Sequence, residues 1–270
     1  MDVLTEEVQE RAPWNMLFAD DIVLVDKSKE RLEEKLERWR LAVEEGGLRI
    51  SRIKTEYMWF GGDGKPGSIK LGEQNLTRTG EFKYLGSYIN EKGELDREIT
   101  HRIQAGWLNW KRMTGVLCDS RVRRNIKGKI FKSVVRPAMI YGSETWQIKK
   151  AQEKRLEVAE MRMLRWTMGK TRMDKIRNET IRKMGGVVEV SRKIQERRLQ
   201  WYGHVMRRED DYVGRRVASI QVEGRRARGR PKRRWNDCIV EDLREKSLQQ
   251  EDVMDRREWR RRVRNSDPLD

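Results

Sequence analysis

The spacing of apolar residues changes once along this chain, near Glu94, and this change constrains the fold more than any other feature. Before Glu94, short strand-like runs at 55–60, 68–71 and 82–89 are separated by turn-forming residues. After Glu94, apolar residues recur at every third or fourth position, as they do on the buried face of an α-helix. The sequence therefore predicts an α+β fold, in which a small antiparallel part with a β-hairpin is followed by a mostly α-helical region.

One helix is also expected within the first part of the chain. Ser28 is a suitable N-cap, and apolar residues follow it at helical spacing up to Val43. Gly46-Gly47 then ends this helix. Further helices are expected after Glu94, at 99–107, 126–134 with an end near Pro137, 156–166, 172–184, 190–207, 235–246 and 251–264.

The composition limits how these helices can pack. Hydrophobic residues make up 36% of the chain and charged residues 39%, so little apolar surface is available for burial. Several small helical units suit such a chain better than one thick core, and the ten tryptophans add buried area to them. We expect Trp166 and Trp201 in the core, His204 in a structural role, and a solvated, ion-paired helical face formed by Asp242, Glu245, Asp252 and Asp255.

The net charge of +17 is concentrated in one region. Residues 170–234 hold 21 Lys or Arg against 8 Asp or Glu, whereas the first 150 residues hold 28 against 23. A polyanion is therefore the expected partner, and nucleic acid is the first candidate, because its phosphates release counterions when cations neutralise them. An anionic membrane surface is the alternative, but no long apolar run and no basic amphipathic anchor favours a membrane.

The few cysteines and histidines argue against a zinc site. Cys118, Cys238, His101 and His204 show no metal-ligand spacing, and no disulfide framework is expected. The acidic N-terminal stretch lacks the pattern of a signal peptide. We therefore expect an intracellular protein of the nucleus or the cytoplasm.

Residues 14–25, WNMLFADDIVLV, predict two short strands joined by a turn at Asp20-Asp21. Adjacent carboxylates repel each other unless a cation lies beside them. Hard oxygen ligands of this kind suit Mg²⁺, and nucleotidyl transfer uses two such ions. Taken alone, the same residues also fit an ordinary exposed turn.

Several stretches, taken in order, are similar to one protein family. The run FADDIVLV resembles the catalytic turn of reverse transcriptases of the non-LTR (LINE-type) retrotransposon family. Gly47 to Ile50, leading to Lys54-Thr55-Glu56, is similar to the next palm motif of that family. Residues 82–87, FKYLGS, resemble its primer-grip hairpin. Four more stretches resemble the C-terminal region of these proteins, namely 141–146, 162–166, 198–205 and 229–231.

The resemblance implies an RNA-directed DNA polymerase, with RNA and DNA as template, primer and target. It also implies three domains: a palm remnant with the primer grip at 1–92, a helical thumb at 93–150, and a basic helical C-terminal region at 151–270.

The resemblance further assigns roles to individual residues. Asp20 and Asp21 would bind Mg²⁺, and Lys54 would protonate the departing pyrophosphate. Taken alone, Lys54 is equally a solvated side chain. The residues that would position the primer are Tyr84, Leu85 and Gly86, in a hairpin whose glycine allows close approach of the backbone.

Part of the family's catalytic machinery has no counterpart in this sequence. The metal site of the family needs an aspartate from a strand well upstream of the Asp-Asp turn. Only 19 residues precede Asp20, and Asp2 is the one aspartate among them. The fingers are absent as well. We therefore expect a fragment that binds Mg²⁺ weakly or not at all and does not polymerise by itself. A separate chain is one source that could supply the missing palm and fingers.

The stretch GRRARGRPKRRW predicts a basic loop that binds nucleic acid. Three roles are open for it: contact with phosphates without sequence choice, a nuclear-localisation tract, and an AT-hook. The stretch Arg228-Gly229-Arg230-Pro231 resembles the core of an AT-hook. The residues concerned are Arg225, Arg226, Arg228, Arg230, Lys232, Arg233 and Arg234.

Three functions follow as alternatives. The chain is a fragment of a non-LTR reverse transcriptase, a non-catalytic basic nucleic-acid-binding protein derived from a retroelement, or the product of a decayed element without a role. Metal-dependent primer extension would select the first, and salt-dependent binding without extension would select the second.

Overall fold

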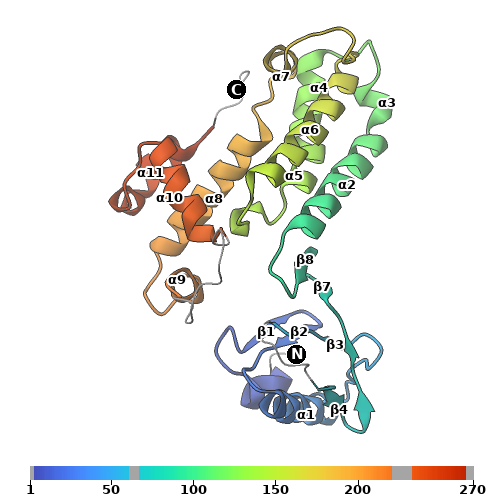
Figure 1. Ribbon diagram of the computed structural model, residues 1–270, viewed down its shortest axis with the longest axis vertical. Coiled ribbons are helices and arrows are strands. Elements are labelled where there is room, and N and C mark those ends of the chain that lie inside the picture. Colours follow the sequence, from blue (N-terminus) through green and yellow to red (C-terminus); the bar gives the residue numbers. More distant parts are fainter. Residues whose placement is uncertain (1–2, 61–66, 221–232, 266–270) are drawn as a thin grey trace, which may run out of the picture. The chain divides into compact units, whose positions relative to one another are not determined.

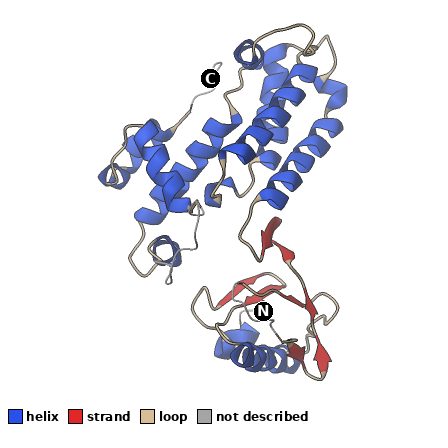
Figure 2. Cartoon of the chain, in the orientation of Figure 1, coloured by secondary structure: helices blue, strands red, loops and turns tan. Residues whose placement is uncertain are grey.

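The computed structural model describes residues 3–60, 67–220 and 233–265. The chain divides into two compact units, Met1–Glu94 and Leu95–Asp270. The strands lie in the first unit, and the described part of the second unit is helical (Figure 2). This confirms the α+β class expected from the sequence. A further division of the second unit at residue 150 stays a prediction.

The strands of the first unit pair in twos (Figure 1). Its elements are η1 (Val3–Val8), β1 (Asn15–Phe18), β2 (Asp21–Leu24), α1 (Lys29–Glu45), β3 (Glu56–Tyr57), β4 (Lys70–Leu71), β5 (Gln74–Asn75), β6 (Thr77–Arg78), β7 (Glu81–Tyr84) and β8 (Ser87–Asn90). The pairs β1–β2, β4–β5 and β7–β8 are antiparallel, and β3–β6 is parallel. The strand-like runs at 55–60 and 68–71 are shorter than expected, because each finds a partner strand of only two residues.

Helix α1 forms as its sequence predicts. The Ser28 hydroxyl accepts a hydrogen bond from the backbone N–H of Arg31, and Gly47 follows the helix with a left-handed φ of 78°. One face of α1 buries Leu36 in a small core shared with Ile69, Leu71 and Leu76. Burial of these side chains joins α1 to the strands that follow it.

The second unit contains α2 (Asp96–Arg112), α3 (Thr114–Leu117), α4 (Arg124–Ile130), the π-helix η2 (Phe131–Val135), α5 (Arg136–Met139), η3 (Ser143–Thr145), α6 (Lys150–Thr167), α7 (Asn178–Gly185), α8 (Val190–Met206), α9 (Val213–Ala218), α10 (Trp235–Glu245), η4 (Glu251–Met254) and α11 (Arg256–Val263). One large core cluster includes side chains from Ile99 to Ile194, and a smaller one joins α8, α10, η4 and α11. None of the helices that the described residues form is both long and apolar enough to cross a membrane.

Helices α2 and α6 run parallel. Near their first turns, Gln152 donates a hydrogen bond to Asp96 at 2.9 Å, and near their last turns the Trp110 indole donates one to the Thr167 hydroxyl at 2.9 Å. The C-terminal ends of the two helices therefore lie together.

A buried ion-pair network holds the middle of this unit. Glu160 is fully buried on α6, accepts hydrogen bonds from Arg136 at 2.8 Å and the backbone N–H of Val190 at 3.1 Å, and lies 3.9 Å from Arg182. Because a buried charge is costly unless it is paired, these contacts fix how α5, α6, α7 and α8 meet.

Three expectations for the helical part are wrong in detail. The helix expected to end near Pro137 continues to Met139, because the wider π-turn at 131–135 accommodates the missing proline N–H. The helix expected from residue 172 begins only at Asn178. In the preceding turn the Asp174 carboxylate accepts hydrogen bonds from the Thr171 N–H and hydroxyl at 2.6 and 2.8 Å, and these bonds replace helical ones.

The last expected helix, 251–264, is split. Its first turn is the 3₁₀ helix η4, and the Asp255 carboxylate then caps α11 by accepting from the N–H groups of Arg257 and Glu258. The Trp259 indole donates to the backbone carbonyl of Leu199 at 3.1 Å, which ties α11 to α8.

Candidate functional site

The two acids Asp20 and Asp21 lie at the tip of the β1–β2 hairpin. Phe18 pairs with Asp21, so Ala19 and Asp20 form a two-residue turn. Ala19 has a left-handed φ of 55°, which a residue with a Cβ rarely adopts. Residues 18 to 21 are all exposed. The hairpin expected at this position is therefore present, and both carboxylates face solvent at its end.

The second hairpin, β7–β8, has a similarly tight tip. Tyr84 pairs with Ser87, and the two turn residues, Leu85 and Gly86, have φ values of 47° and 82°. Two consecutive left-handed residues are typical of a type I′ turn, in which the second position is normally glycine. The hairpin expected for FKYLGS is present.

One electrostatic effect relates the two hairpins. Tyr84 is partly buried, and this burial, together with the negative charge of Asp21, raises the pKa of its phenol. These two residues are 63 positions apart in the sequence, and both hairpins belong to the first unit.

Lys54 lies outside both hairpins. It is exposed, in a turn where its backbone N–H bonds to the carbonyl of Ser51 at 3.1 Å. Its ammonium forms no ion pair with Asp20 or Asp21 among the described residues. The role assigned to Lys54 stays a prediction.

The fit of a magnesium ion can be tested on the donor set. Asp20 and Asp21 supply hard carboxylate oxygens of the right kind. However, the part of the chain that the structure describes contains no group of three or more His, Cys, Asp or Glu residues placed to hold one metal ion. Two exposed carboxylates do not by themselves make a closed site, so we derive no metal-dependent step from this chain.

The basic tract is only partly described. Arg225, Arg226, Arg228, Arg230 and Lys232 lie outside the described residues. The last two predicted residues, Arg233 and Arg234, lie where α10 begins.

These two arginines have structural contacts. Arg233 donates from Nε to the Cys238 sulfur at 3.0 Å and pairs with Glu241. Burial disfavours its charged form, but the hydrogen bonds to Cys238 and Glu241 outweigh that effect and raise the pKa of Arg233. The backbone N–H of Arg234 donates to Asp237 at 2.7 Å. Both residues therefore help to start α10.

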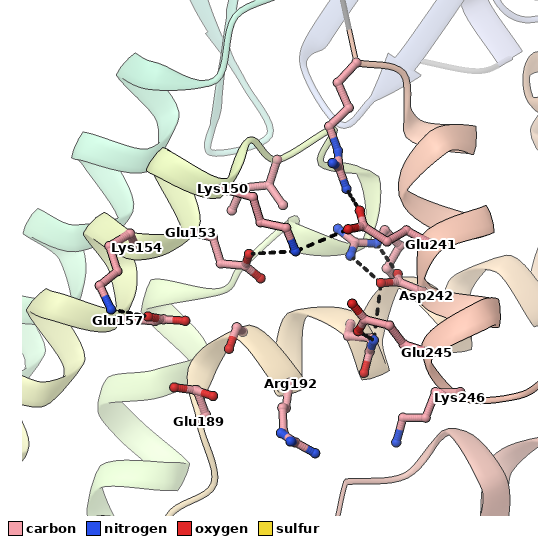
Figure 3. A pocket seen from close by; sticks show the side chains of 15 residues that line it. Lys150, Glu153, Lys154, Glu157, Glu189, Arg192, Glu241, Asp242, Glu245 and Lys246 are labelled. Atoms are coloured by element: carbon pink, nitrogen blue, oxygen red, sulfur yellow. Dashed lines mark hydrogen bonds and ion pairs between the residues drawn. The ribbon is translucent and has the colours of Figure 1, made fainter. Parts of the chain in front are cut away.

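The sequence did not reveal a cavity of about 660 Å³ between α6, α8 and α10 (Figure 3). Lys150 lies 3.9 Å from Glu153 on the same helix and reaches across the cavity to Glu241 of α10 at 3.3 Å. Burial raises the pKa of Glu153, with Lys150 opposing the shift and the charge of Glu157 adding to it. The lining contains six cations and six carboxylates, so the cavity presents no net charge to a ligand.

The pair of Arg198 and Asp242, which lines this cavity, shows that the expectation of a solvated Asp242 is wrong. Asp242 is buried rather than solvated, and Arg198 donates to its carboxylate from Nε at 2.6 Å and Nη2 at 2.9 Å. Asp242 continues the apolar face of α10 after Ile239, and Arg198 continues that of α8 after Ile194. That helical spacing is the signal that could have identified both as buried.

The aromatic residues also differ in part from expectation. Trp166 is 48% exposed and not part of the core. Trp201 is partly buried and stacks on His204 with ring centroids 5.3 Å apart. The ring contact agrees with a structural role for His204.

Comparisons with known proteins identify relatives of this chain. A transposon-derived protein of Caenorhabditis elegans is 30% identical over 279 residues, which cover 93% of this chain and 97% of that protein. A retrovirus-related Pol polyprotein from a type-1 retrotransposable element of Nasonia vitripennis is 30% identical over 95 residues, or 31% of this chain and 9% of that polyprotein. No family model and no solved structure matches the chain.

Proposed function

The chain belongs to the family of the transposon-derived protein of Caenorhabditis elegans, and we propose that it is a region of a non-LTR retrotransposon reverse transcriptase. This region would run from the end of the palm through the primer grip and thumb into a basic C-terminal part. The similarity of 95 residues to a Pol polyprotein of a type-1 retrotransposable element supports the proposal.

The observation that carries the proposal is that both segments form tight hairpins within one unit, with the two acids at the tip of β1–β2 and the FKYLGS turn at the tip of β7–β8. Asp21 at the tip of β1–β2 acts on the Tyr84 phenol at the tip of β7–β8. A polymerase must hold its metal-binding carboxylates beside the primer end, because the attacking hydroxyl has to lie within reach of the metal ion. In this proposal Asp20 and Asp21 supply part of a Mg²⁺ site, and Tyr84, Leu85 and Gly86 line the place of the primer end.

As part of this proposal, the chain does not polymerise alone. The described residues offer two carboxylates at the hairpin tip and no third ligand beside them. Two-metal catalysis needs further oxygen ligands to hold both ions. A separate chain or segment with fingers and an additional palm aspartate would complete the site.

The test is a fusion experiment. The fingers and first palm part of a non-LTR reverse transcriptase are joined to the N-terminus of this chain, and extension of a primed RNA template is measured with Mg²⁺. We expect extension by the fusion, background activity after Asp20→Asn with Asp21→Asn, and no effect of Glu45→Gln, an exposed carboxylate on α1. Undiminished extension without the two acids would contradict their role.

A second candidate is a non-catalytic nucleic-acid-binding protein derived from a retroelement. The incomplete ligand set favours it. It predicts salt-dependent binding of RNA or DNA by the chain alone, together with no extension by any fusion.

A further inference from the structure

One end of the helical unit collects elements that are far apart in the sequence. It consists of the last turns of α2 and α6, helices α4 and α7, and the loop 168–177, and we call it the basic end. Lys127 of α4 donates to the carbonyl of Thr167, the last residue of α6, at 3.2 Å. Helix α4 also packs directly on α7, beside which Figure 1 shows it. A Cβ on Gly128 would lie only 1.6 Å from the carbonyl oxygen of Gly185.

The basic end presents cations that have no partner among the described residues. Six of its Lys and Arg side chains are exposed and form no hydrogen bond or ion pair with any described residue: Arg123, Arg124, Lys129, Arg172, Lys175 and Arg177. The Arg233 guanidinium at α10 shows the contrast, because it is occupied by Glu241. Unpaired cations on neighbouring elements create a positive potential that attracts an anion.

The acids near the basic end do not cancel this charge. The segment 120–143 contains no Asp or Glu. Asp119, just before it, is paired with Arg121 at 2.8 Å. Asp174 accepts hydrogen bonds from the Thr171 N–H and hydroxyl, which lower its pKa and keep it ionised, and Glu179 in the first turn of α7 is exposed. These two negative charges are fewer than the six unpaired cations. The field at this end therefore stays positive.

The basic end also presents an aromatic ring. Trp166 occupies the last turn of α6, where its ring packs on Trp107 and Trp110 with centroids 5.5 and 5.6 Å away. Arg162 lies 5.8 Å from the same ring. The indole is thus supported by two other rings, yet 48% of the residue is exposed. A supported and half-exposed indole at the same end of the unit as the unpaired cations is suited to stack on an unpaired base.

We propose that the basic end binds single-stranded nucleic acid, with phosphates on the unpaired cations and one base stacked on Trp166. A single strand is preferred over a duplex, because the bases of a duplex are already stacked on one another and not free to cover the indole. The inference deepens the proposed nucleic-acid function and rests on it. The inference depends on neither the Asp-Asp turn nor the basic tract at 225–234. The roles proposed for the basic end, the Asp-Asp turn and the basic tract can therefore be tested independently.

The experiment measures the affinity of the full-length chain for a fluorescein-labelled single-stranded RNA of about 15 nucleotides over a range of salt concentrations. Replacing Arg123, Arg124 and Lys129 by Gln removes three exposed cations of α4. We expect affinity to fall about tenfold and the slope of log K against log salt to decrease by about 2, since each phosphate contact on a single strand contributes about 0.7. The matched control replaces three exposed arginines of α11 by Gln, namely Arg256, Arg257 and Arg260, and leaves both quantities close to wild type.

The stacking part is tested at Trp166. Trp166→Leu keeps an apolar side chain but loses the ring, and it lowers affinity about tenfold, whereas Trp166→Phe keeps most of it. Circular dichroism of both variants at 222 nm checks that α6 is intact. Equal binding by the Leu and Phe variants would overturn the stacking.

Three other outcomes are informative. Wild-type binding by the α4 variant, together with loss of binding after Arg225, Arg226 and Arg228 are replaced by Gln, would overturn this inference and leave the basic tract as the nucleic-acid site. Tighter binding of a duplex of the same length would also overturn it, and so would an α4 effect confined to phosphatidylserine vesicles. Primer extension by the fusion protein decides the reverse transcriptase proposal independently of all three.

Discussion

The contact between Gly128 and Gly185 makes a sharp prediction about how α4 packs on α7. An Ala at position 128 would place its Cβ 1.6 Å from the Gly185 carbonyl oxygen and 2.6 Å from the carbonyl carbon. These are backbone atoms, which cannot rotate away as a side chain can. To reach the 3.0 Å that real Cβ atoms keep, α7 must move by about 1.4 Å.

The magnitude follows from two opposing effects. Overpacking of this kind costs about 1–3 kcal/mol, and the upper end applies here because the shift also loosens the buried Ile181 of α7. Alanine gains about 1 kcal/mol over glycine inside a helix. We therefore expect Gly128→Ala to lower the free energy of unfolding by about 2 kcal/mol.

The matched control is Gly115→Ala in the short helix α3. Nothing lies within 4 Å of a Cβ built on Gly115, and its φ is not left-handed. This change should be neutral or stabilise the chain by up to about 1 kcal/mol. Urea unfolding followed at 222 nm reports mainly on the helical unit, and the two variants should differ by about 2–3 kcal/mol. A difference below about 0.5 kcal/mol would show that α4 and α7 do not pack backbone to backbone.

Four further outcomes are expected. Glu160→Gln should lower the free energy of unfolding by about 3–5 kcal/mol, because it leaves Arg136 buried without its counter-charge. The control Glu157→Gln, next to the exposed Lys154, should lower the free energy of unfolding by less than about 1 kcal/mol in the same urea experiment. Leu85→Asn should stabilise the β7–β8 hairpin by about 1 kcal/mol, since asparagine tolerates a left-handed φ, and an unchanged melting curve would argue against the type I′ turn. Burial raises the pKa of Glu153 above its ordinary value of 4.5, so its stabilising contribution is complete below that pH and is lost as the pH rises through the folded pKa. Glu153→Gln should accordingly raise the melting temperature at pH 7 and 8 but not at pH 4, and a gain independent of pH would contradict this. Amide exchange should be faster in Met1–Glu94 than in Leu95–Asp270, because the strand pairs of the first unit keep open edges among the described strands, and equal protection of the two units would count against it.

Local signals explain which parts of this fold could be predicted from the sequence. The start of α1 depends on the Ser28 hydroxyl, which accepts a hydrogen bond from the N–H three residues later. The β7–β8 hairpin depends on two turn residues. Both are readable from a window of fewer than about ten residues. The α+β order of the chain follows from the same short-range spacing.

The failures have a common cause, which is dependence on a distant partner. Whether Asp242 is solvated depends on Arg198, 44 positions earlier, because the two close a bidentate pair between α8 and α10. Trp166 has the spacing of a core residue, but the helix that could cover its outer face is not there in the described structure, and its partners on α2 support only one side. Helical periodicity identifies the face of a helix and does not show what packs on it.

In the candidate site too, local features could be predicted from the sequence and long-range ones could not, and backbone strain is a further feature. Each hairpin tip could be found from its own residues, whereas the effect of the Asp21 charge on Tyr84 could not, since it relates residues far apart in the chain. Of the four non-glycine residues with positive φ in the described chain, Ala19 and Leu85 occupy the tips of these two hairpins. A left-handed conformation costs a residue with a Cβ about 1–2 kcal/mol, and glycine would remove that cost at either position. Strain of this kind persists where neighbouring contacts require a side chain in an unfavourable conformation, which is common at binding and catalytic sites. Both strained residues lie in the hairpins to which the proposal assigns the two acids and the primer grip, and the residue types at these positions do not reveal the strain.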